Sequence, residues 1–192
     1  MIPSACSACG RRPRQWRRRR GPRSQAESFI PQTGAVVLEI AEVEYNSDRY
    51  LDLVNLRRRV LRAPLGLDFT SEQLAGERTD IHLAAYLGGE LVGCAILTPI
   101  DPSRGVVKLR QMAIEPDRQG CGVGAQIVAF AEHWSVARGY RQIILRARES
   151  AVGFYEKAGY AAIGQIFIEV TIPHREMAKQ LAKVPNATPS ES

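Results

Sequence analysis

Hydrophobic positions in the first half of the chain alternate between the period of a strand and that of a helix. β-Branched and aliphatic runs bounded by turn residues indicate strands, and apolar residues three to four apart indicate a helix. Ser47 is a typical helix N-cap, and Gly88-Gly89 is typical of a tight hairpin turn. The pattern predicts strands at 36–43, 81–86 and 91–97, a helix from Ser47 to about Arg62, and a short helical turn at 72–75.

The second half alternates strands with amphipathic helices. Val123, Ile127, Phe130 and Trp134 form an apolar stripe, and Gly139 is placed to end that helix. The remaining elements predicted here are strands at 106–114 and 143–147, a helix at 151–158 and one long last strand at 163–172. A hairpin followed by strand–helix–strand units predicts an α/β fold with a mixed sheet.

Length and composition suit one folded domain. The chain has 192 residues, of which 45% are hydrophobic, an ordinary share for a globular protein. No apolar run reaches the ~18 residues that cross a bilayer, and the N-terminus lacks the apolar core of a signal peptide. We therefore expect a cytoplasmic protein with no membrane contact.

The positive charge is concentrated at the N-terminus. Residues 1–34 hold eight arginines and one glutamate, whereas the rest of the chain is close to neutral. We predict a disordered basic arm at 1–34, a domain at 35–184 and a flexible tail at 185–192. Nucleic acid could bind through the arginines of the arm, but no aromatic residue is interleaved within the basic run Arg17–Arg20, which favours a plain unstructured extension. Cys6 and Cys9 have half the spacing of a zinc knuckle without a second pair, so we expect no metal site.

A glycine-rich loop carries the main chemical prediction. Three glycines, Gly120, Gly122 and Gly124, lie between a predicted strand and a predicted helix. Unpaired amides at a helix N-terminus favour an anion, and Arg118 adds a cation beside them. The loop lacks the Gly-Lys-Ser/Thr ending of a P-loop, and several strands precede it, unlike a dinucleotide fold. We therefore predict a site for the phosphates of another ligand.

Two segments together resemble the GNAT N-acetyltransferases. Gln119, Gly122 and Gly124 match the pyrophosphate loop of that family, Gln/Arg-x-x-Gly-x-Gly/Ala. The segment from Ala151 through Tyr155 to Gly159-Tyr160 is similar to the family's Ala-x-x-x-Tyr-x-x-x-Gly-Phe. The end, Ile172-Pro173-His174 followed by Met177, looks like the closing strand of a small bacterial branch. The resemblance spans about 36–177.

The resemblance implies a mostly antiparallel central sheet flanked by helices and splayed near Ile114, with acetyl-CoA as co-substrate. It implies acetyl transfer to a primary amine of a small molecule or peptide. Carried over residue by residue, the acetyl-CoA contacts would be Met112, Ala113, Ile114, Arg118, Gln119, Gly120, Cys121, Gly122, Val123, Gly124 and Ala125. The family often has an asparagine where this chain has Arg148, so that contact does not carry over.

Tyr155 is the candidate catalytic acid, because a phenol and a thiol have comparable pKa values. The alternative for Tyr155 is packing beside Phe154. Glu169 and His174 are candidate substrate or base residues, although a solvated face or a turn would also explain them, and water could carry the proton. Cys121 occupies the variable position of the pyrophosphate loop, which argues against a covalent acyl intermediate.

Other functions fit the same sequence. One alternative is a non-catalytic acyl-CoA sensor, and another is a nucleic-acid-associated protein that acts through the arm. The acceptor amine is not determined by the sequence. An exposed final strand could pair two copies into a homodimer.

Overall fold

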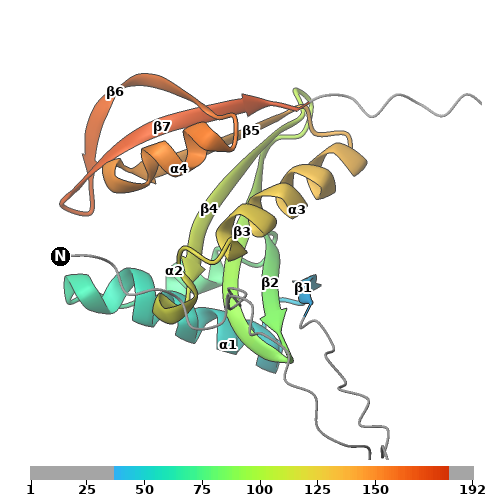
Figure 1. Ribbon diagram of the computed structural model, residues 1–192, viewed down its shortest axis with the longest axis vertical. Helices are drawn as coiled ribbons and strands as arrows, with labels where there is room; N and C mark the ends of the chain where they lie inside the picture. Colours follow the sequence, from blue (N-terminus) through green and yellow to red (C-terminus); the bar gives the residue numbers. More distant parts are fainter. Residues whose placement is uncertain (1–36, 182–192) are drawn as a thin grey trace, which may run out of the picture.

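One seven-stranded sheet organises the computed structural model, in the order β1-β2-β3-β4-β5-β7-β6 (Figure 1). The structure describes residues 37–181. The strands are β1 Leu38–Val43, β2 Ile81–Leu87, β3 Glu90–Asp101, β4 Val106–Ile114, β5 Gln142–Arg148, β6 Ala161–Glu169 and β7 Ile172–Gln180. Neighbouring strands are antiparallel except β4 and β5, which run parallel. The predicted mixed, mostly antiparallel sheet is confirmed.

Helices cover both faces of this sheet and bury a separate core on each. The helices are α1 Asp48–Arg57, α2 Ser71–Ala75, α3 Val123–Ala137 and α4 Val152–Lys157. On one face α1 packs through Leu53 and Leu56 against Ala84, Cys94 and Ala113 of the sheet. On the other face, α3 and α4 bury side chains against a second set that includes Leu109 and Leu145.

Side-chain caps start both helices of the first half. The Ser47 hydroxyl accepts from the amide of Tyr50, as expected of an N-cap. Thr70 caps α2, and the Gln73 side chain accepts a reciprocal bond from the Thr70 amide. After α1 the chain continues as a π-helical turn, Arg58–Arg62, so the predicted helix extends to Arg62 with a changed hydrogen-bond pattern.

The prediction of one long strand at 163–172 is wrong, because the chain turns back at Val170-Thr171. β6 and β7 form a hairpin across this two-residue turn, in which Val170 and Thr171 have φ of 50° and 63°. β-Branched residues rarely adopt positive φ, and no glycine or asparagine marks the turn. The final strand is therefore not exposed at the sheet edge: β7 lies between β5 and β6, and β6 is the edge strand on that side of the sheet.

The sheet opens between β4 and β5. The two strands pair only from Val106–Gln142 to Leu109–Leu145, and beyond that point β4 continues to Ile114 paired with β3 but no longer with β5. Figure 1 shows β4 running away from β5 toward α1 and α2. The predicted splay is present; it begins after Leu109, and Ile114 lies at its wide end.

The predicted arm at 1–34, with Cys6 and Cys9, and the predicted tail at 185–192 lie outside the described residues. Within residues 37–181, no helix is long and apolar enough to cross a membrane.

The turn between β6 and β7 offers a test of the corrected topology. Val170→Asn combined with Thr171→Gly should raise the free energy of unfolding by about 1 kcal/mol, because both new residues tolerate positive φ. For a domain of this size the melting temperature should then rise by roughly 2–4 °C. Val170→Thr keeps a β-branched residue at the same φ and should give no gain. A loss of stability in the double variant would contradict the hairpin.

Candidate functional site

A β-bulge shapes β4 next to the splay. Arg110 pairs with Ile96 and Ala113 with Cys94, so Gln111 and Met112 together face a single residue of β3. Gln111 has φ of 51°, an uncommon conformation for a residue other than glycine. A bulge bends the strand and re-aims the side chains that follow it. The open part of β4 therefore starts from a distorted backbone, and contacts from outside the strand are needed to stabilise it.

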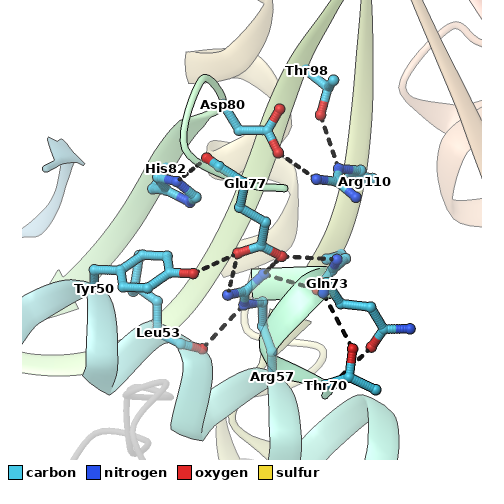
Figure 2. A network of polar contacts seen from close by, with 11 residues as sticks. Tyr50, Leu53, Arg57, Thr70, Gln73, Glu77, Asp80, His82, Thr98 and Arg110 are labelled. Carbon is cyan, nitrogen blue, oxygen red and sulfur yellow. Dashed lines mark hydrogen bonds and ion pairs between the residues drawn. The ribbon is translucent and has the colours of Figure 1, made fainter. Parts of the chain in front are cut away.

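A buried ion pair lies beneath this bulge (Figure 2). Arg57 at the end of α1 and Glu77 after α2 are each 1% exposed. The guanidinium of Arg57 donates two parallel bonds to the carboxylate of Glu77, at 2.7 and 2.9 Å. The hydroxyl of Tyr50 donates a third bond to Glu77 at 2.9 Å. Such forked, charge-assisted pairing is among the strongest polar contacts in proteins.

The same ion pair holds the bulge through the side chain of Gln111. Arg57 Nη1 donates to Gln111 Oε1 at 2.8 Å, and Gln111 Nε2 donates to Glu77 Oε1 at 3.2 Å. Burial would raise the pKa of Glu77, but the bonds and charge of Arg57 outweigh burial and hold the pKa below its ordinary value. The carboxylate therefore stays ionised at neutral pH and keeps Gln111 in place.

A cavity of about 550 Å³ opens where β4 and β5 separate. Side chains from the π-helical turn, β4, β5, α4 and the β6–β7 hairpin line it. Of the residues singled out from the sequence, those in its wall are Met112, Ile114, Gln119, Arg148, Tyr155, Glu169 and His174. The structure thus brings both ends of the predicted site, the strand before the glycine loop and the tyrosine segment, to one cavity.

The glycine-rich loop joins the end of β4 to α3. Gly120 and Gly122 have φ of 75° and 85°, and Gly122 is the N-cap of α3. The first helical bond here runs from the Gln126 amide to the Gly122 carbonyl, which leaves the preceding amides at the helix start for another acceptor. Gln119 Nε2 donates to the Ile114 carbonyl at 3.2 Å and ties the loop to β4.

The other loop residues differ in exposure. Gly120, Gly122 and Ala125 are exposed, and Arg118, Cys121 and Gly124 are half-buried. Val123, the first residue of α3, packs in the core, and Ala113 is buried against α1, so only their backbone groups are available to a ligand. Cys121 is outside the cavity lining, which gives no support to covalent chemistry there.

Tyr155 is buried in the wall of the cavity, with 8% of its surface exposed. Its ring contacts Phe154 and Tyr160 edge-on, at centroid distances of 4.9 and 5.7 Å. Burial raises the pKa of Tyr155 to about 12. The phenol therefore keeps its proton across the neutral range, the form that an acid requires, although the same shift makes it a weaker acid than an ordinary tyrosine.

The two candidate base residues sit on opposite sides of the β6–β7 turn, and both line the cavity. His174 Nδ1 lies 2.9 Å from the Ile172 carbonyl; a carbonyl only accepts, so Nδ1 carries the proton and a neutral ring has its lone pair on Nε2. Glu169 pairs with Arg146 at 3.3 Å. Arg148 donates to the Leu61 carbonyl at 3.3 Å.

Sequence reasoning missed the cationic wall of the cavity and the buried network beneath it. Lys108 and Arg110 alternate along β4, as Arg146 and Arg148 do along β5, and all four side chains line the cavity. Both strands were predicted from the sequence, and side chains two residues apart on a strand lie on the same face of the sheet. The spacing of these cations could therefore have revealed a charged face. No comparable sequence pattern marks Glu77, because its neighbours in the sequence do not distinguish it from a solvent-exposed glutamate. Within residues 37–181 no cluster of three metal-ligating side chains occurs.

Comparisons with known proteins agree with this geometry. The model of the acetyltransferase (GNAT) family matches residues 49–160. The chain is 27% identical to YjcF of Bacillus subtilis, described as an uncharacterised N-acetyltransferase, over 140 residues that cover 72% of this chain and 98% of that one.

Solved structures share the fold. One is a crystal structure described as an N-acetyltransferase of Lactobacillus plantarum, with a TM-score of 0.67 and 21% identity over 76% of this chain and 99% of that one. Another is an aminoglycoside 6'-N-acetyltransferase in complex with coenzyme A, with a TM-score of 0.64 and 22% identity over 77% of this chain and 99% of that one.

The buried pair predicts a large and pH-dependent effect of Glu77→Gln. The variant leaves Arg57 buried without a counter-charge and should lose about 3–5 kcal/mol of unfolding free energy at pH 7. Because the folded pKa of Glu77 is depressed, its contribution is present above the ordinary glutamate pKa and is lost as the pH falls below about 4. Urea unfolding at several pH values should show the two proteins converging in acid.

The control is Asp68→Asn, which removes the carboxylate of the exposed Arg58–Asp68 pair and should change stability little. Equal losses in both variants would contradict the special role of the buried pair.

Proposed function

Because this chain belongs to the acetyltransferase (GNAT) family, we propose that it transfers an acetyl group from acetyl-CoA directly to a primary amine of a small-molecule or peptide acceptor, with Tyr155 as general acid. Enzymes of this family use acetyl-CoA as the acyl donor. The observation that carries the proposal is the position of Tyr155 in the wall of a cavity that begins where β4 separates from β5. The glycine-rich loop lies at the end of the same strand.

The donor would lie along the open part of β4. In this proposal the pyrophosphate of acetyl-CoA contacts the backbone amides from Gln119 to Ala125, and Arg118 supplies a nearby cation. The pantetheine arm pairs with the backbone of Met112, Ala113 and Ile114, whose edge has no β5 partner. The positive φ of Gly120 and Gly122 supports this use, because it lets amides converge without an intervening Cβ atom.

The transfer itself needs four events. The neutral amine attacks the thioester carbonyl and forms the C–N bond, while a backbone N–H near Ile114 stabilises the developing oxyanion. The C–S bond then breaks, and Tyr155 gives its proton to the departing thiolate. The amine loses its extra proton to His174, Glu169 or water. The free Nε2 lone pair of a neutral His174 supports its candidacy.

A homodimer stays a prediction, but the strand that would pair the two copies is not the final strand that the sequence suggested. The described sheet has β1 at one edge and β6 at the other, and in β6 Ile163, Ile166 and Ile168 are 46%, 48% and 68% exposed. An exposed apolar edge can pair with a second copy.

Gly122→Asp tests the donor site. The new carboxylate would sit beside the pyrophosphate, so we expect the Kd for acetyl-CoA in calorimetry to rise at least tenfold. Gly122→Asn is the matched control, because it adds nearly the same side chain at the same φ of 85° without the charge. Asparagine should therefore weaken binding much less than aspartate. Unchanged affinity in the aspartate variant would exclude a phosphate site at this loop.

Tyr155→Phe tests the proton donor. The ring and its packing are kept while the hydroxyl is removed, so kcat should fall by about 10²–10⁴-fold and the KM for acetyl-CoA should change far less. Tyr160→Phe removes the hydroxyl of the neighbouring buried tyrosine, which is not in the cavity lining, and should leave kcat nearly unchanged. A Tyr155→Phe enzyme with full kcat and reduced thermal stability would instead assign Tyr155 a packing role and water the proton.

A further inference from the structure

The cavity wall is strongly asymmetric in charge. Its lining comprises five basic side chains and one carboxylate, with the ionisable side chains of His174 and Tyr155 besides. The charged residues are Arg62, Lys108, Arg110, Arg146, Arg148 and Glu169. A pocket that admits an ordinary ammonium-bearing amine would not need this excess of positive charge, so the cations call for a chemical explanation.

Only two of these cations have a carboxylate partner within residues 37–181. Asp80 pairs with Arg110, which also donates to Thr98 at 2.8 Å, and Glu169 pairs with Arg146. Lys108 has no ion pair in the described part of the chain. Burial and the nearby Arg146 lower the pKa of Lys108. The charges of Glu169 and Glu176 oppose this shift, but neither carboxylate forms an ion pair with Lys108, so the cavity contains a half-buried ammonium group without a direct carboxylate partner among the described residues.

Arg62 and Arg148 are also without a carboxylate partner among the described residues. Arg62 stacks its guanidinium on the ring of Phe69 at 4.8 Å from the centroid, and Arg148 donates to the Leu61 carbonyl. These contacts orient both cations without neutralising them. A negative charge that enters the cavity would therefore meet three positive charges not already compensated by a carboxylate.

Lys108 lies far from the loop that would hold the phosphates of the donor. It precedes Ile114 by six residues, which is about 20 Å along a strand. Its side chain is also on the other face of β4 from Leu109, which packs in the core beneath α3. The phosphate loop leads into α3 on that opposite face. The cations at Lys108 and Arg146 therefore belong to the part of the cavity left for the acceptor.

We propose that the acceptor amine carries a carboxylate or phosphate group, and that Lys108 and Arg146 bind this anion. The inference rests on the acetyl transfer proposed above and specifies its substrate class. An anionic group would compensate Lys108 and could share Arg146 with Glu169, as charge-assisted hydrogen bonds favour. A polyamine would instead place further positive charge beside uncompensated cations, which selects against it.

Matched amines test the substrate class directly. We would measure CoA release and acetylated product with O-phosphoethanolamine against ethanolamine, β-alanine against β-alaninamide, and spermidine. Within each pair the anionic member should have a kcat/KM about 10–100-fold higher, the range expected for one charged hydrogen-bonded contact. Spermidine should be the poorest acceptor.

Variants assign the preference to the proposed residues. Lys108→Gln and Arg146→Gln should each raise the KM for the anionic acceptor about tenfold and leave the KM for acetyl-CoA unchanged. In both variants the kcat/KM of the anionic amine should move closer to that of the neutral amine in the same pair. Arg78→Gln removes an exposed cation that does not line the cavity and should keep the full preference. Thermal melts establish that each variant is folded.

Three outcomes would contradict, in turn, the anionic acceptor, the role of Lys108 and the acetyltransferase function. Equal or better acetylation of the neutral amines or spermidine would refute the anionic acceptor and leave the acetyltransferase function standing. A Lys108→Gln enzyme with a raised KM for acetyl-CoA and an unchanged acceptor KM would assign Lys108 to the donor. No acetylation of any amine by the wild-type protein would refute the proposed function itself.

Discussion

The buried pair of Arg57 and Glu77 is the contact on which the geometry of this protein depends. Two ionised groups with 1% exposure are stable inside a core only when their hydrogen bonds are satisfied. Here the partners come from α1, the segment after α2 and, through Gln111, the bulge of β4. One interaction therefore joins three parts of the chain that are distant in sequence. It holds a backbone conformation at Gln111 that glutamine would rarely adopt alone.

The bulge and the splay together shape the space between β4 and β5 in which the proposed site lies. Pairing to β5 ends at Leu109, so the strand beyond it has an edge without a neighbouring strand inside an otherwise continuous sheet. The glycine-rich loop begins where this edge ends, and Tyr155 faces the same cavity from α4. In the proposed function, the pantetheine arm of acetyl-CoA would pair with this open edge in the way that another strand would.

Local patterns predicted most elements correctly because their determinants are neighbours in sequence. Ser47 and Thr70 cap the helices that follow them, and Gly88-Gly89 turns β2 into β3. The hairpin of β6 and β7 escaped prediction since Val170 and Thr171 favour extended backbone, and their positive φ is imposed by the pairing of the strands on either side. The consequence was a missing seventh strand and a wrong edge for the sheet.

The amino-acid sequence by itself determined the fold class and predicted the phosphate loop and Tyr155 as the residue to test, because glycine spacing and a strand–loop–helix order are local properties. It did not reveal Glu77, Gln111 or the cations that share a cavity. The roles of those residues depend on interactions between positions that are distant in sequence: Arg57 with Glu77 and Gln111, and Lys108 with Arg146. Burial and charge proximity exist only once the strands and helices are packed, so the cationic wall of the cavity could be recognised only in the tertiary structure.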